Sequence, residues 1–270
     1  GEALNALAAG EATVAAGCTD LFAATQAKRL PGPVLDVTAI TALRGIARDP
    51  EGLKIGAATT WTDLARAELP PALRGLQQAA RQVGALQVQN RGTLGGNLCN
   101  ASPAADGVPP LLTLDAEVEL RSAAGARRLP LRDFLVGPRR TALEPGELLT
   151  AVRIPAAALE GTGAFLKLGA RAHLVISIAM TAARIALRGG VVVEAALAAG
   201  ACGPVATRLP EVEAALIGHP LDPARIEDVA VAAALSPIED VRADAAYRGR
   251  GAAELVRRTV AGLAPQGLAA

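Results

Sequence analysis

Two glycine-containing segments carry the residues most suited to chemistry. The first covers residues 15–21, with the sequence AAGCTDL, between an expected strand at 13–16 and an expected helix at 21–29. A strand–glycine–helix junction exposes backbone N–H groups at the positive end of the helix, and this arrangement suits a phosphate. Thr19 adds a hydroxyl group, and Asp20 could cap the helix. An ordinary turn also explains this segment when it is taken alone.

The second segment covers residues 91–106, with the sequence RGTLGGNLCNASPAAD, and is the stronger signal. Adjacent Gly95 and Gly96 permit positive φ and a close approach of the backbone to a ligand. Successive N–H groups in such a loop can form a nest that binds an anion. Neutral hydrogen-bonding side chains flank the glycines, namely Thr93, Asn97 and Ser102.

Asp106 ends this second segment, and its carboxylate could accept a hydrogen bond from a ribose or ribityl hydroxyl group. Neither segment matches the G-x-G-x-x-G dinucleotide fingerprint or the Walker A pattern. A single dinucleotide site of the Rossmann type is therefore not supported. We expect instead that two separate segments hold one pyrophosphate from two sides. A glycine-rich structural turn is the alternative for the second segment.

Little else in the composition could act as a catalyst. The 270 residues include two histidines, three cysteines and five aromatic residues. The cysteines are too widely spaced for a zinc or iron–sulfur ligand set, so we predict no metal site and no catalytic side chain. The net charge of +1 argues against nucleic acid or an anionic membrane as a partner. Scattered thiols and the lack of a membrane-length apolar run predict a cytoplasmic protein.

The hydrophobic pattern predicts a mixture of helices and strands around these segments. Period-2 alternation with a glycine turn predicts a hairpin at 116–131. Residues 155–163 are the best linker candidate, and 176–187 fits either a strand or a helix. The other expected strands are 34–37, 53–57, 148–154, 164–168 and 191–201. The other expected helices are 3–9, 60–67, 72–83, 210–217, 223–234 and 247–263.

The two segments also carry a resemblance to a known family. The sequences AGCTDL at 16–21 and TLGGNLCNASPAADGVPPLLTLDAEVEL at 93–120 resemble the two flavin-binding motifs of the molybdenum hydroxylase FAD subunit. This is the medium subunit of the xanthine dehydrogenase and carbon monoxide dehydrogenase family. Weaker similarity extends over almost the whole chain in the family's order, at 53–64, 146–155, 165–179 and 240–250. Only the second motif is specific by itself.

The resemblance implies an α+β fold with an FAD-binding domain of the vanillyl-alcohol-oxidase-like (PCMH) type. It implies FAD-binding subdomains at 1–57 and 58–157 and a C-terminal α+β domain at 163–270. Cofactor-binding roles carry over to Val14, Ala15, Ala16, Gly17, Cys18, Thr19, Asp20, Leu21, Thr93, Gly95, Gly96, Asn97, Ser102, Asp106, Leu149 and Lys167. In this family the positive charge of Lys167 would lie near the flavin; a solvated strand end is the alternative.

The same resemblance implies FAD on this chain, with molybdopterin and 2Fe-2S clusters on a large and a small partner subunit. Electrons would pass from FAD to NAD+ or another acceptor. The sequence of segment 165–179 is more similar to members of the xanthine dehydrogenase type than to carbon monoxide dehydrogenases. One departure stands out, because Cys18 occupies a position where the family usually has glycine. If the backbone at this position has a positive φ, a cysteine lowers the stability by about 1 kcal/mol relative to glycine. The alternative is that Cys18 has an ordinary backbone conformation.

Two other functions stay open at this level. The first is a self-contained FAD oxidoreductase that resembles UDP-N-acetylmuramate dehydrogenase. Such an enzyme needs its own substrate-binding and proton-donating groups, and no convincing set is found in the sequence. The second is a scaffold that has lost the cofactor, for which Cys18 is the only indication.

Overall fold

The computed structural model of the chain describes residues 1–10, 12–26, 29–30 and 32–264. Its centre is an antiparallel five-stranded sheet with the order β3-β4-β9-β5-β6. The strands are β3 (Ile46–Asp49), β4 (Gly52–Gly56), β5 (Glu117–Ser122), β6 (Gly125–Pro130) and β9 (Leu148–Pro155). The predicted hairpin at 116–131 is confirmed as β5 and β6. Val118 and Leu120 alternate with more polar residues and are fully buried, as period-2 patterning requires.

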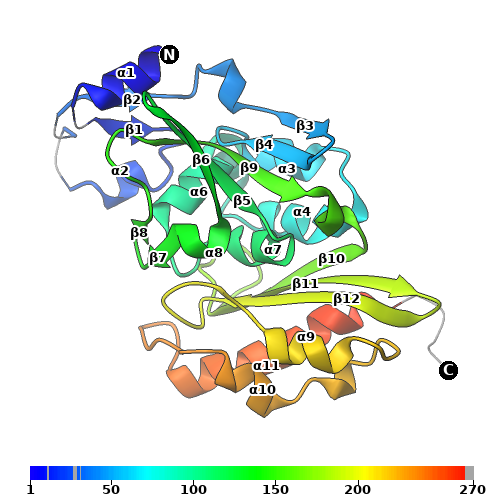
Figure 1. Cartoon of the computed structure of the whole chain (residues 1–270). Coiled ribbons are helices and arrows are strands. Elements are labelled where there is room, and N and C mark those ends of the chain that lie inside the picture. Colours follow the sequence, from blue (N-terminus) through cyan, green and yellow to red (C-terminus); the bar gives the residue numbers. More distant parts are fainter. Residues whose placement is uncertain (11, 27–28, 31, 265–270) are drawn as a thin grey trace.

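Short helices cover one face of this sheet and separate it from a second sheet (Figure 1). They are α3 (Trp61–Arg66), α4 (Arg74–Ala80), α5 (Leu86–Arg91), α6 (Leu94–Asn100) and α7 (Val108–Thr113). Thr60 begins α3 with a capping box, in which its hydroxyl accepts from the Asp63 N–H and the Asp63 carboxylate accepts from the Thr60 N–H. Trp61 and Leu64 of α3 are buried in the core between the helices and the sheet.

The N-terminal part forms a smaller unit beside the five-stranded sheet. It contains α1 (Glu2–Ala8), the parallel pair β1 (Thr13–Ala15) and β2 (Val34–Asp36), and α2 (Leu21–Ala24). The helix expected at 21–29 is shorter than predicted, because Thr25 leaves the helix with an extended backbone. Residues 27 and 28 of that prediction lie outside the described residues.

The first strands of the five-stranded sheet precede the expected boundary between the FAD-binding subdomains at residue 57. Strand β4 pairs with β9, and β3 pairs with β4, although both lie before that boundary. Sheet pairing therefore joins residues 46–56 to the second expected subdomain. The division at 57 stays a prediction about how FAD is bound.

The C-terminal part is an antiparallel sheet covered on one face by helices (Figure 1). Its strands are β10 (Thr162–Leu168), β11 (Ala179–Arg188), β12 (Val191–Gly200) and β13 (Thr207–Arg208), and its helices are α9 (Pro210–Leu216), α10 (Asp228–Ala233) and α11 (Ala245–Ala261). The ambiguous segment 176–187 is thus a strand from Ala179 onward. The single helix expected at 223–234 is two elements, a 3-10 turn at Pro223–Arg225 and α10.

Arginine side chains connect the second sheet to the helical layer through hydrogen bonds. Arg184 of β11 donates to the Thr113 carbonyl oxygen at 2.9 Å, and Arg208 of β13 donates to the Leu112 carbonyl oxygen at 3.0 Å. Both carbonyls belong to the C-terminal turn of α7, where free backbone acceptors are expected. Among the described residues, none of the helices combines the length and the apolar character needed to cross a membrane.

Candidate functional site

A cavity of about 740 Å³ lies where the N-terminal unit, the helical layer and the chain before β11 meet. Its volume is within the range typical of small-molecule and cofactor sites. Both glycine-containing segments reach its wall, although they are far apart in the sequence. Of the 16 residues predicted to bind a cofactor, 14 line the cavity: Val14, Ala16, Gly17, Cys18, Thr19, Asp20, Leu21, Thr93, Gly95, Gly96, Asn97, Ser102, Asp106 and Leu149.

The other two predicted residues, Ala15 and Lys167, lie behind the wall. Ala15 is buried, and its carbonyl oxygen accepts a hydrogen bond from the Val37 N–H at 2.9 Å. Lys167 contacts the cavity indirectly, through the side chain of Asp106. The structure therefore brings nearly all of the predicted residues together and assigns these two supporting positions.

The first segment is a loop with unused backbone donors. Strand β1 ends at Ala15, and the chain turns before α2 begins at Leu21. Among the described residues, the N–H groups of residues 17–20 donate to no protein acceptor. Gly17 packs directly on the backbone of the second segment, where a Cβ atom would overlap the Arg91 carbonyl oxygen and lie 2.7 Å from the Gly92 Cα. This loop can bind an anion through its N–H groups.

The second segment differs from the expectation. Gly95 and Gly96 lie in the first turn of α6 and have no positive φ, so the predicted nest conformation is wrong. The Gly95 N–H donates to the Ala57 carbonyl oxygen at 2.8 Å, and the Gly96 N–H donates to the Thr93 hydroxyl at 3.1 Å. Thr93 is the N-cap of α6, so capping uses the Gly96 N–H, while the Ala57 carbonyl uses the Gly95 N–H.

Close packing explains the first of these glycines. A Cβ atom at Gly95 would lie 2.7 Å from the Ala57 Cβ and 2.8 Å from the Ala57 carbonyl oxygen. Gly96 is exposed toward the cavity, and a Cβ there would meet only the Thr93 hydroxyl at 2.9 Å. Gly95 thus brings α6 against the end of β4, whereas Gly96 keeps the cavity wall free of a side chain.

Asn97 offers a polar atom that the protein itself does not satisfy. The Asn97 side-chain oxygen is buried and has no hydrogen-bond partner among the described residues. Since buried polar atoms are nearly always paired, an unpaired acceptor beside a cavity indicates a donor on a ligand. This atom and the unused donors of the first segment fit a group that has both hydroxyls and phosphates, as FAD does.

Cys18 has a left-handed backbone with φ of 57°. The position therefore does require the conformation that glycine adopts most easily, and the cysteine tolerates it at a cost of about 1–2 kcal/mol. The Cys18 thiol donates to the Ala16 carbonyl oxygen at 3.4 Å. Burial, followed by the nearby Asp36 carboxylate, raises the pKa of this thiol, so it stays protonated at neutral pH.

Replacing Cys18 with glycine is expected to leave FAD affinity within about threefold of the original, because the loop already has the glycine-like conformation. The relief of strain and the greater freedom of the unfolded chain nearly cancel, so stability should change by less than about 1 kcal/mol. Titration with FAD and thermal unfolding measure both effects. A flavin-free natural protein whose Cys18→Gly variant binds FAD would instead identify the cysteine as a block.

A buried ion pair supports the end of the second segment. The Lys167 ammonium group donates to Asp106 at 2.7 Å, and the Ser177 hydroxyl donates to the other oxygen of the same carboxylate at 2.6 Å. The two charged side chains are 6% and 9% exposed. Burial raises the pKa of Asp106, while the Lys167 charge and the two hydrogen bonds oppose this shift. This pair joins the helical layer to the second sheet beside the cavity.

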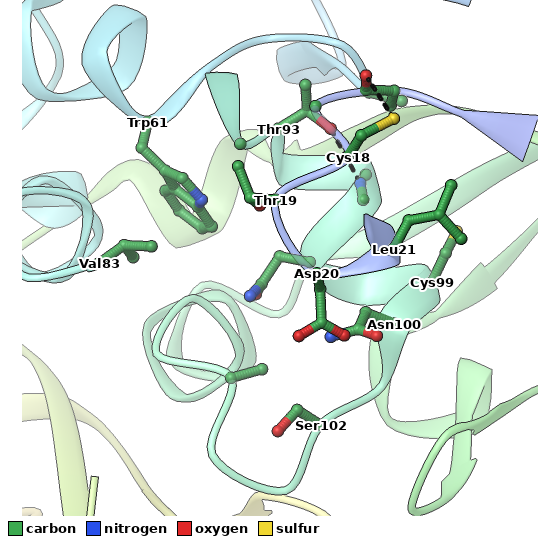
Figure 2. Close-up of a pocket in the computed structure, with 18 of the residues that line it drawn as sticks. Cys18, Thr19, Asp20, Leu21, Trp61, Val83, Thr93, Cys99, Asn100 and Ser102 are labelled. Atoms are coloured by element: carbon green, nitrogen blue, oxygen red, sulfur yellow. Dashed lines mark hydrogen bonds between the residues drawn. The ribbon is translucent and has the colours of Figure 1, made fainter. Parts of the chain in front are cut away.

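Apolar residues that the sequence interpretation missed complete the walls. Trp61, expected only in the core, is 2% exposed and also faces the cavity, opposite Leu21 and Cys99 in Figure 2. The other missed apolar residues include Val83, Val88, Leu174, Val175 and Ile176. Residues 174–176 lie inside a segment whose resemblance to the family was noted, so that signal could have found them.

Two charged residues of the wall were also missed. Glu147 accepts from Arg127 at 2.6 Å and 2.8 Å, and these bonds lower its pKa. Arg139 lies in the tight turn between β7 (Leu135–Gly137) and β8 (Arg140–Thr141). Glu147 lies in segment 146–155, which resembles the family, so that signal could have found it, whereas no motif includes Arg139.

Comparisons with known proteins agree with this fold. The domain described as the FAD binding domain in molybdopterin dehydrogenase matches residues 1–157. The domain described as the CO dehydrogenase flavoprotein C-terminal domain matches residues 164–263. The two matches together confirm the expected class, an FAD-binding domain followed by a C-terminal domain of mixed helix and sheet.

Relatives and solved structures point the same way. The chain is 35% identical to the nicotinate dehydrogenase FAD-subunit of Eubacterium barkeri, over 77% of this chain and 72% of the relative. It is 33% identical to the xanthine dehydrogenase FAD-binding subunit of Escherichia coli O157:H7, over 80% and 73% respectively. A structure of carbon monoxide dehydrogenase from Hydrogenophaga pseudoflava aligns with a TM-score of 0.90 and 30% identity, covering 97% of this chain and 93% of that chain.

Proposed function

This chain belongs to the FAD-binding medium subunits of the molybdenum hydroxylase family, and from this membership we propose a specific electron-transfer role. The chain binds FAD in the cavity and connects the 2Fe-2S clusters of a small partner subunit with NAD+ or another acceptor. A large partner subunit with a molybdopterin cofactor hydroxylates the substrate. We propose that the complex is of the xanthine dehydrogenase type, in line with the similarity to the Escherichia coli subunit.

One observation carries the proposal. The two predicted flavin-binding segments meet on a single cavity, and both present polar groups that have no protein partner among the described residues. The first segment presents the N–H groups of residues 17–20, and the second presents the side-chain oxygen of Asn97. A purely structural role does not account for a buried side-chain oxygen that has no partner beside a large cavity.

The chain's own groups would bind and shield the cofactor. The N–H groups of residues 17–20 would donate to phosphate oxygens, and Asn97 would accept from a hydroxyl or N–H group of FAD. Trp61, Val83 and the apolar residues 174–176 would exclude water from the remaining walls. When bound, FAD supplies the capacity to accept and release electrons, so this chain needs no acid–base pair of its own.

The first test is whether the full chain binds one FAD per molecule. We expect flavin absorption in the purified protein, or its recovery after incubation with FAD. The variant Gly96→Val places a side chain beside the cavity and should weaken FAD binding about tenfold or more. Gly249→Val in α11 is the matched control, since a Cβ there has no neighbour within 4 Å. Equal flavin content in all three proteins would contradict the site.

A second test addresses the acceptor and the substrate. Loss of the visible flavin absorption on anaerobic addition of NADH would support NAD+ as the acceptor, because the reaction then runs in reverse. A chain that retains FAD but does not react with NADH must use another acceptor. For the substrate, the complex with its co-purifying large and small subunits should oxidise xanthine. Oxidation of carbon monoxide or of an N-heterocyclic acid in its place would contradict the assigned type.

A further inference from the structure

The distribution of charge around the cavity is uneven. The cavity is lined by three acidic residues, Asp20, Asp106 and Glu147. Among the described lining residues, Arg139 is the only basic one. The proposed ligand, FAD, carries a pyrophosphate with two negative charges. An anion bound in this cavity can therefore accept hydrogen bonds from backbone N–H groups, and Arg139 is the basic side chain that could add a positive charge.

Two of the acidic residues are neutralised from behind the wall. Lys167 holds Asp106 at 2.7 Å, and Arg127 holds Glu147 at 2.6 Å. Lys167 is 6% exposed and its partner is 9% exposed, so separating this pair would leave an uncompensated buried charge. Lys167 is consequently committed to Asp106 and is a poor source of positive charge for a ligand.

Arg139 is held in place at the backbone and bridges the two segments through its side chain. It has a left-handed backbone with φ of 57°, and its N–H donates to the Ala101 carbonyl oxygen at 2.8 Å. Its guanidinium group donates to the Asp20 carboxylate at 2.8 Å and to the side-chain oxygen of Asn100. Asp20 belongs to the loop with unused N–H groups, so the guanidinium lies beside the anion-binding part of the cavity.

The pair between Arg139 and Asp20 is exposed and therefore easy to exchange. The two side chains are 55% and 50% exposed, and such surface ion pairs contribute little to stability. A phosphate, in contrast, matches the planar donors of arginine and forms strong charge-assisted bonds. If the Arg139 guanidinium group exchanges Asp20 for a phosphate, little stability is lost with the old ion pair, and the new interaction is stronger.

We infer that Arg139 is a ligand-binding residue that supplies positive charge to the pyrophosphate of FAD. Asp20 is its partner in the flavin-free protein and competes with the phosphate for the guanidinium group. This inference rests on the proposed function. It adds a residue from the turn between β7 and β8 to a site that the sequence motifs place only on the two glycine-containing segments.

The test compares three variants of the full chain in titrations with FAD at low and at high ionic strength. Arg139→Gln should weaken FAD binding about tenfold or more at low ionic strength, because a charged hydrogen bond is lost. Asp20→Asn should leave affinity unchanged or raise it, since it frees the guanidinium group. Arg140→Gln is the matched control, because neighbouring Arg140 is exposed and does not line the cavity.

Salt and riboflavin separate this role from a structural one. The loss in Arg139→Gln should shrink at high ionic strength, where charges are screened, and binding of riboflavin, which has no phosphate, should be unchanged. A structural bridge would instead make Asp20→Asn and Arg139→Gln weaken both flavins equally, and that result would overturn the inference. Natural protein that fails to bind FAD would overturn the proposed function itself, whereas equal FAD affinity of Arg139→Gln and the natural chain would overturn this inference alone.

Discussion

Replacing Lys167 with methionine is expected to lower the free energy of unfolding by about 3–5 kcal/mol at neutral pH, because a buried charge loses its partner. The Lys167 ammonium group is the only cation bonded to Asp106 among the described residues, and both side chains are nearly inaccessible to solvent. Ser177 would still donate one hydrogen bond, but a hydroxyl cannot neutralise the carboxylate. Urea-induced unfolding followed by circular dichroism measures the change.

The loss should depend on pH in a definite direction. Burial already raises the pKa of Asp106 above its value in the unfolded chain, and Lys167 opposes that shift. Without Lys167 the pKa of the folded variant rises further, so the folded state keeps a proton that the unfolded state releases. The destabilisation should therefore be smallest near pH 4 and should grow as pH rises through the pKa of the folded variant.

Two comparisons isolate the charge. The double variant Asp106→Asn with Lys167→Met should recover much of the lost stability, because it leaves no unpaired ion. Lys54→Met removes a more exposed lysine that lies 3.6 Å from Glu119, and it should cost less than about 1 kcal/mol. A Lys167→Met variant that is equally destabilised at pH 4 and pH 8 would show that lost packing, rather than charge, is the cause.

Replacing Gly17 with alanine is expected to weaken FAD binding about tenfold or more and to destabilise the protein by about 1–3 kcal/mol. The added Cβ would overlap the Arg91 carbonyl oxygen and crowd the Gly92 Cα, and both are backbone atoms that cannot rotate away. The first loop would have to move away from the second segment. Its N–H groups would then no longer point at the same part of the cavity.

Gly10→Ala provides the matched control for this prediction. Gly10 lies on the same N-terminal stretch, and a Cβ there has no neighbour within 4 Å. We expect its FAD affinity and stability to equal those of the natural protein. FAD titration and near-ultraviolet circular dichroism should be recorded together, so that a lost site is distinguished from a lost fold. Unchanged FAD affinity in Gly17→Ala would mean that the contact between the segments does not shape the site.

Local sequence signals predicted most of the elements correctly. The alternation around Val118 and Leu120 specified the hairpin, because side chains on a strand point alternately to the two faces of a sheet. The helix expected at 223–234 divided because Pro223 begins a separate turn and Ile226 returns to an extended backbone. The strand at 179–188 could not be distinguished from a helix by pattern, since it is buried almost throughout and shows no alternation.

For the site, the two glycine-containing segments predicted from sequence are the ones that line the cavity. Glycines at 17, 95 and 96 permit a close approach of the backbone to other groups, and this property is local. Which acceptor each backbone N–H group finds depends on how distant parts of the chain pack together. Thr93 and Ala57 accept hydrogen bonds from the N–H groups of Gly96 and Gly95, whereas the N–H groups of residues 17–20 have no acceptor among the described residues. The tertiary structure also decided that Lys167 is committed to Asp106 while Arg139 remains exchangeable, because burial and partner choice depend on residues brought together from distant parts of the chain.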